Sequence, residues 1–85
     1  MFVYNMLVYG YGFSPRTILV TTSIEEIKHK LEELCWPRDI RELDKDALYQ
    51  VFPSFDYTTS YIVEGYDLNL VYDIKQLYRI FKGRR

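Results

Sequence analysis

The segment Phe2 to Tyr9 (FVYNMLVY) constrains the fold most, because apolar side chains fall on both of its alternating faces. Aromatic and β-branched residues dominate it, as is typical of β-strands. A strand that is apolar on both faces needs cover on both, so we expect this one to lie at the centre of a sheet. The fold must therefore supply something to cover the second face.

A loop and a second strand are predicted directly after this segment. Gly10, Gly12 and Pro15 interrupt the apolar pattern, and a β-branched run resumes over residues 17–22 (TILVTT). Glycine and proline are the strongest local signals for a turn, whereas β-branched residues favour strands. Residues 1–22 therefore predict strand, loop and strand.

A helix is predicted to begin at Ser23, which forms a capping-box pattern with Glu26. In this pattern the serine hydroxyl accepts a hydrogen bond from the glutamate amide, and the glutamate side chain reaches back to the serine amide. Apolar residues then recur at helical spacing, and Pro37 prevents the helix from continuing. These apolar residues are Ile24, Ile27, Leu31, Leu34 and Cys35.

The second half of the chain has the same order of elements with weaker signals. Residues 38–46 are predicted as a charged connector with a short helical turn, and residues 47–52 as a stretch compatible with strand or helix. A strand closed by glycine follows at residues 58–64, and a final helix runs from Asp67 or Asn69 to Gly83. We therefore predict one α+β domain over residues 1–85. It is a two-layer sandwich in ββαββα order, with an antiparallel sheet of about four strands and both helices on one face.

The composition argues against a membrane span, a metal site, a cofactor and catalysis. The apolar runs are much shorter than the roughly 18 to 20 residues that a span requires, so we expect a cytoplasmic location. Cys35 is the single cysteine and His29 the single histidine, too few for a zinc site. His29 is predicted on the solvated side of its helix and Cys35 on the packed side, so neither indicates an enzyme.

The stretch Tyr9 to Arg16 (YGYGFSPR) is the most motif-like segment. It lacks the third glycine and the following helix of a dinucleotide-binding loop, and the lysine of a Walker loop. Residues 10–13 (GYGF) resemble the centre of the strand motif in RNA recognition motif domains, which implies base stacking on its aromatic residues. That family carries the motif on its third strand, and Pro15 would interrupt such a strand. We therefore favour a turn.

Basic residues concentrate at the end of the chain. Residues 1–68 carry six basic and eleven acidic side chains, whereas residues 69–85 carry five basic and one acidic. On the final helix, Lys75, Arg79 and Lys82 are spaced by four and three residues, so they lie on one face. Two further basic residues follow the helix. We predict contacts with phosphate groups or with an acidic partner at Lys75, Arg79, Lys82, Arg84 and Arg85.

Tyrosine is unusually abundant, with nine tyrosines against five phenylalanines. Each buried tyrosine hydroxyl needs a hydrogen-bond partner, so we expect several of these rings to be half exposed. Exposed aromatic residues near the first strand and its loop would suit a protein interface. The predicted partner-binding residues are Tyr4, Tyr9, Tyr11, Phe13, Arg16 and Tyr61.

Our leading hypothesis is a small protein-binding module, such as an inhibitor or antitoxin of a phage or bacterial conflict system that acts by occlusion. Its size and its lack of a catalytic constellation fit that class. The alternative is a component that binds RNA, with Tyr9, Tyr11 and Phe13 stacking on bases and the basic row contacting phosphates. Self-association into a homodimer is a further way to cover the second face of the sheet.

Overall fold

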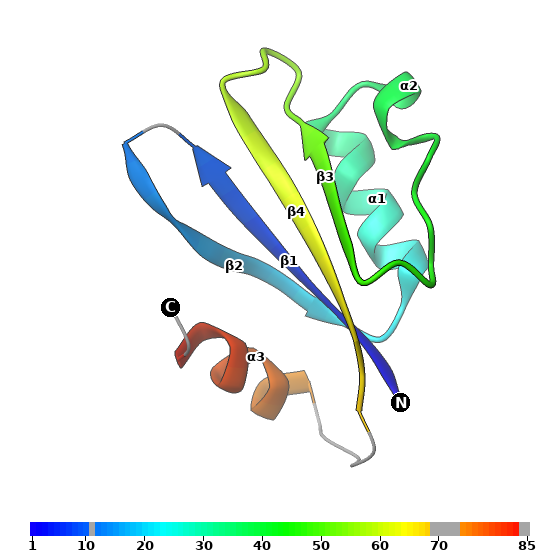
Figure 1. Cartoon of the computed structure of the whole chain (residues 1–85), viewed down its shortest axis with the longest axis vertical. Helices are drawn as coiled ribbons and strands as arrows, with labels where there is room; N and C mark the ends of the chain where they lie inside the picture. Colours follow the sequence, from blue (N-terminus) through cyan, green and yellow to red (C-terminus); the bar gives the residue numbers. More distant parts are fainter. Residues whose placement is uncertain (11, 69–73, 84–85) are drawn as a thin grey trace.

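An antiparallel sheet of four strands, in the order β2-β1-β4-β3, forms the centre of the computed structural model (Figure 1). The structure describes residues 1–10, 12–68 and 74–83. The strands are β1 (Phe2–Gly10), β2 (Phe13–Thr21), β3 (Tyr49–Pro53) and β4 (Thr59–Asp67). The helices are α1 (Ile24–Leu34), α2 (Pro37–Ile40) and α3 (Ile74–Gly83). This confirms the α+β class, the antiparallel sheet and the ββαββα order.

One face of the sheet, the α1 face, carries the larger core. Tyr4 and Met6 of β1 contact Ile27 and Leu31 of α1 within one buried cluster. The other core residues of this cluster are Cys35, Ile40, Phe52 and Val63. The segment after α1 joins the same layer, because Ile40 of α2 is buried in this cluster. The apolar stripe predicted for α1 is therefore the face that packs.

The opposite face, the α3 face, is covered in part by α3. Phe81 packs with Val3 of β1 and Val20 of β2, and its ring lies 4.8 Å from that of Tyr66 between centroids. The prediction that both helices lie on one face is therefore wrong. The reason lies in β1, whose successive side chains point to opposite faces, so that Val3 and Tyr4 each need a helix. Figure 1 shows α3 set against the β2 side of the sheet, away from β3.

The start of α1 differs in one detail from the predicted capping box. The Ser23 hydroxyl accepts a hydrogen bond from the Glu26 amide at 3.3 Å, as predicted. The Ser23 amide instead donates to the Thr21 hydroxyl at 3.0 Å. Because Thr21 is the last residue of β2, this bond joins the strand directly to the helix that follows it.

The β1–β2 hairpin is tighter than the predicted loop. β2 begins at Phe13, so Pro15 lies within a strand. Proline is tolerated there because β2 is an edge strand. Gly12 has a positive φ of 88°, which a turn residue with a side chain would rarely adopt. The prediction of a turn at this stretch is confirmed, with its end moved to Phe13.

In the second half of the chain, residues 47–52 were compatible with strand or helix, and the structure contains β3 there. The short helical turn predicted in the connector is α2. β4 extends to Asp67, so the final helix does not begin at that residue. The alternative start at Asn69 lies outside the described residues.

Candidate functional site

An aromatic cluster lies on the surface where the end of α1 meets the loop between β3 and β4. Trp36 packs edge-on against Phe55, with ring centroids 5.0 Å apart and an interplanar angle of 83°. The Trp36 indole Nε1 also donates a hydrogen bond to the Phe55 carbonyl at 2.9 Å. Trp36 is nevertheless 45% exposed and Phe55 41%. Both rings are held in place and still face solvent.

The Asp56 carboxylate orders the loop that carries Phe55. Its Oδ1 accepts hydrogen bonds from the hydroxyls of Thr58 and Ser54, each at 2.8 Å, and from the Thr58 amide at 3.1 Å. The bonds from Thr58, and then the one from Ser54, lower the pKa of Asp56. The ionised carboxylate therefore fixes the directions of Phe55 and of the next aromatic residue, Tyr57.

Tyr57 adopts a left-handed backbone conformation, with a φ of 61°. This conformation costs a residue with a side chain about 1–2 kcal/mol, and glycine or asparagine is the usual occupant. The Tyr57 side chain is also 54% exposed, so burial does not offset the strain. The Tyr57 amide donates to the Ser54 carbonyl at 3.0 Å, so this residue closes the turn between β3 and β4 and presents its ring to solvent.

Arg38 completes the cluster, which we call the aromatic patch: Trp36, Arg38, Phe55 and Tyr57. The Arg38 guanidinium donates a hydrogen bond to the Tyr57 hydroxyl, and this bond raises the pKa of Arg38. The Arg38 Nε also lies 3.9 Å from the Asp39 carboxylate, and the guanidinium has five N–H donors, so others remain for a ligand. With Pro37, the patch lines a surface depression of about 390 Å³. The patch thus combines apolar walls with a permanent positive charge.

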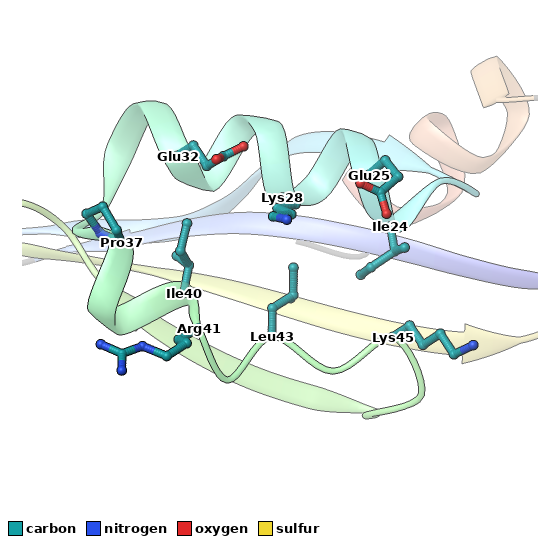
Figure 2. A pocket seen from close by; sticks show the side chains of 9 residues that line it. All are labelled: Ile24, Glu25, Lys28, Glu32, Pro37, Ile40, Arg41, Leu43 and Lys45. Carbon is teal, nitrogen blue, oxygen red and sulfur yellow. The ribbon is translucent and has the colours of Figure 1, made fainter.

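A second depression, of about 510 Å³, lies between α1 and the segment 37–45 (Figure 2). In Figure 2, Ile40 and Leu43 project toward α1 and form an apolar floor with Ile24. Charged side chains of both signs surround this floor: Glu25, Lys28, Glu32, Arg41 and Lys45. Because opposite charges alternate around an open surface, this depression selects no particular ligand.

His29 and Cys35 lie in settings that do not favour catalysis. The His29 side chain is 80% exposed and lies 3.7 Å from the Glu33 carboxylate. Cys35 is a free and buried cysteine. Burial, and then the nearby Asp39 charge, raise the pKa of Cys35 to about 11. The thiol is therefore protonated at neutral pH and is a poor nucleophile.

Of the predicted partner-binding residues, Tyr4 lies in the core and Tyr61 packs against it. Tyr4 is 5% exposed, and its hydroxyl donates a hydrogen bond to the Lys45 carbonyl at 2.8 Å. Tyr61 is partly buried against the same cluster. The placement of Tyr4 at an interface was wrong because its hydroxyl finds a partner inside the fold, which makes burial favourable.

The other predicted residues near the hairpin are divided between the two faces of the sheet. Tyr9 is 51% exposed and Phe13 44%. The pairing register places Tyr9 on the α3 face, whereas the Phe13 ring lies over Gly10 on the α1 face. The Arg16 guanidinium lies 5.9 Å from the centroid of the Phe13 ring. These residues therefore form no single surface, and Tyr11 lies outside the described residues.

The basic row on α3 is exposed. Lys75, Arg79 and Lys82 all face solvent. The Lys82 amine lies 5.7 Å from the centroid of the Tyr78 ring, and Arg79 Nε donates to the Lys75 carbonyl at 3.4 Å. Arg84 and Arg85, the rest of the predicted row, lie outside the described residues. Contacts of this row with phosphates or with an acidic partner stay a prediction.

The aromatic patch was not predicted from the sequence. Trp36 and Arg38 each lie 19 residues before their partners Phe55 and Tyr57, so only the fold brings the four together. One signal was present: Trp36 is the single tryptophan and precedes a proline at the point where the helix must end. A tryptophan outside the packed stripe of a helix is a reason to look for an interface.

Comparisons with known proteins leave the surface as the main evidence for function. No protein-family model, curated protein or solved structure matches this chain. Within residues 1–10, 12–68 and 74–83, every helix is too short or too polar to cross a membrane. The same stretches contain no group of three or more histidine, cysteine or acidic residues that could hold a metal ion.

Proposed function

We propose that this chain is a protein-binding module whose aromatic patch docks onto a partner protein. Tryptophan, tyrosine and arginine are the residues that most often dominate the binding energy of protein interfaces, and the patch contains one of each. The observation that carries the proposal is Tyr57, which is strained at a φ of 61° while it is 54% exposed. Because the loop is ordered before binding, little side-chain entropy is lost on docking.

The chemistry of the patch indicates what the partner presents. The depression between Trp36, Phe55 and Tyr57 suits an apolar side chain. The free N–H groups of Arg38 suit a carboxylate, which a guanidinium binds through paired hydrogen bonds. The partner surface therefore combines an apolar side chain with a neighbouring aspartate or glutamate.

The narrower part of the proposal is the biological role. We propose a stoichiometric inhibitor or antitoxin that acts in the cytoplasm by occluding its partner. Binding alone suffices for such a role, which agrees with the exposed His29 and the protonated Cys35. The small α+β domain offers a preorganised surface for such binding.

RNA binding is the less favoured alternative. The ionised Asp56 lies between Phe55 and Tyr57 and would repel a phosphate backbone. The basic row lies on α3, whereas Phe13 and Arg16 lie at the hairpin end of the α1 face. Nucleic-acid-binding surfaces combine stacking rings with a basic groove, and here these features do not converge.

The test of this proposal is Tyr57→Asn, because asparagine tolerates the left-handed conformation. Partners captured from the native cell would be purified, and their affinity for each variant measured by calorimetry. We expect binding to weaken at least tenfold, while the free energy of unfolding stays the same or rises by about 1 kcal/mol. The matched control is Tyr9→Asn, which removes a similarly exposed tyrosine outside the patch.

Three results would decide against the proposal. Equal binding by Tyr57→Asn and the wild type would exclude the patch as the docking surface. Loss of binding with Tyr9→Asn alone would move the interface to the hairpin. Binding of a generic single-stranded RNA at low salt, abolished by removing the last three residues, would favour the RNA alternative.

A further inference from the structure

The pairing of β3 with β4 determines which backbone groups of β3 face outward. Ser54 donates from its amide to the Thr59 carbonyl at 2.9 Å, and Gly65 donates to the Leu48 carbonyl at 3.0 Å. In an antiparallel ladder, hydrogen-bonded and non-hydrogen-bonded pairs alternate. With the observed register, residues 50 and 52 bond to β4, and residues 49, 51 and 53 point away from it.

Tyr49 and Val51 therefore present N–H and C=O groups along the outer edge of β3. Pro53 has no N–H group and offers only its carbonyl. No hydrogen bond joins these outward groups of Tyr49 or Val51 to the part of the chain that the structure describes. β3 is the last strand of the sheet on this side, so its edge is open. Such an edge is a template for an added strand.

The side chains at this edge favour a protein segment. Tyr49 is 62% exposed and Val51 51%, and both lie on the α3 face, where α3 packs against β2. Neighbouring Leu48 is 67% exposed. Residues 48–53 (LYQVFP) contain no charged side chain, and the nearest charge across the ladder is that of Glu64, which is paired with Tyr49. Aromatic and β-branched residues on one face of a strand pair favourably with apolar residues across from them.

The open edge leads directly to the aromatic patch. After Pro53, the next residue in the outward series is Phe55, whose amide donates to the Leu34 carbonyl at 3.2 Å. This bond closes the edge at the end of α1. Phe55 also packs against Trp36, so the edge ends where the patch begins. One extended segment can therefore contact both.

We propose that the partner adds an extended segment to β3 as a fifth strand, with its end in the aromatic patch. This inference rests on the proposed function and specifies how the partner binds. The segment is uncharged beside Tyr49 and Val51, with apolar side chains on the α3 face, and carries a carboxylate near Arg38. Main-chain hydrogen bonds supply affinity and the side chains supply specificity, as in other strand additions.

A second copy of this chain suits the edge less well than a single segment. Antiparallel pairing of two β3 strands requires a two-fold axis perpendicular to the sheet, which places both α1 layers on the same side. α1 and α2 already lie on that side beside β3. A single added strand brings no such layer.

The first test asks whether the edge is open in the free protein. We expect rapid hydrogen exchange at the amides of Tyr49 and Val51, and slow exchange at those of Gln50 and Phe52, measured by NMR. Protection of Val51 in the free monomer would overturn the proposal without any variant. Concentration-dependent protection of the same amides would assign the edge to a second copy, and would equally overturn it.

The second test uses random twelve-residue peptides displayed on phage and selected on the wild-type chain. We expect Val51→Pro to weaken the selected peptides at least tenfold, because it removes an outward N–H and spares the bonds to β4. Val51→Thr keeps the N–H and the side-chain shape, so a change below threefold is expected. N-methylation of successive peptide amides should weaken binding at alternate positions only.

The same peptides separate the two proposals. Loss of binding with Tyr57→Asn, but with neither Val51→Pro nor N-methylation, would overturn strand addition and retain the patch. If neither Tyr57→Asn nor Val51→Pro weakens peptide binding, neither the patch nor the edge is the binding surface, and the proposed function would also be overturned. Loss with Val51→Pro together with the alternating effect of N-methylation would support strand addition. An amide exchange pattern unchanged at Gln50 and Phe52 would show that Val51→Pro is folded.

Discussion

The two edge strands of the sheet, β2 and β3, differ in how their outward backbone groups are protected. On β2, the Tyr78 hydroxyl of α3 donates a hydrogen bond to the Thr17 carbonyl at 3.4 Å. Pro15 offers no amide on that strand, and the pairing with β1 is twice interrupted by register shifts. On β3, α3 does not reach Tyr49 or Val51, and the residues of the strand itself carry no charge, although Glu64 of β4 is paired with Tyr49. One edge is closed and the other is open.

This difference identifies the β3 edge as the one where pairing with another chain is least hindered. Open edges promote aggregation, and proteins usually block them with prolines, charges, bulges or covering elements. β2 uses all four of these devices: Pro15, the charge of Arg16, the register shifts and the contact with α3. The unprotected edge adjoins the aromatic patch, which agrees with a surface kept for a partner.

The largest expected effect tests the alternation of side chains along β3. Phe52 is 3% exposed and Val51 is 51% exposed. We expect Phe52→Ala to lower the free energy of unfolding by about 3–5 kcal/mol. Val51→Ala should change it by less than about 0.5 kcal/mol, since it lies on the surface. Chemical denaturation measures both, and equal losses would contradict the strand register.

The next effect concerns the closed edge. Replacing Pro15 and Arg16 together by valine restores an amide and removes a charge from β2, so we expect concentration-dependent association in sedimentation experiments. Ser14→Val is the matched control, because it adds apolar surface and leaves both protecting residues. A double variant that stays monomeric would show that the Tyr78 contact and the register shifts suffice to protect this edge.

The smallest expected effect concerns the loop that joins the open edge to the patch. The pKa of Asp56 is lowered from 3.8 by hydrogen bonds in the folded state. The carboxylate therefore stabilises the fold above the pKa of the unfolded chain, and this contribution disappears as the pH falls through the folded pKa. We expect Asp56→Ala to lower Tm near neutral pH, with the difference from the wild type shrinking in acid. A difference in Tm that does not change with pH would show that the ionised Asp56 carboxylate is not the source of the stabilisation.

Local signals in the sequence predicted most of the fold. The capping pattern at Ser23 located the start of α1, and alternation in β1 located a central strand with two apolar faces. The position of α3 was not predictable in the same way, because an amphipathic helix packs equally well on either face. The demand for cover on both faces of β1 was visible, but α3 was assigned to the wrong one.

The candidate site was less predictable because it depends on tertiary contacts. Phe55 and Tyr57 looked like residues of an ordinary turn until the fold placed them beside Trp36 and Arg38. The left-handed conformation of Tyr57 left no trace in the sequence, since glycine or asparagine is the residue that marks such positions. In contrast, Tyr4 attracted attention as an interface residue although its hydroxyl is satisfied internally.

The Tyr78–Thr17 contact has a consequence for assembly. If both edges were open, the β3 edge of one copy could pair with the β2 edge of the next, and such head-to-tail contacts extend without limit into filaments. With the Thr17 carbonyl in contact with α3, and with Pro15 and two register shifts on the same strand, β2 is less suited than β3 to accept a further strand. This asymmetry between the two edges disfavours head-to-tail growth and leaves β3 as the edge that could accept an added strand.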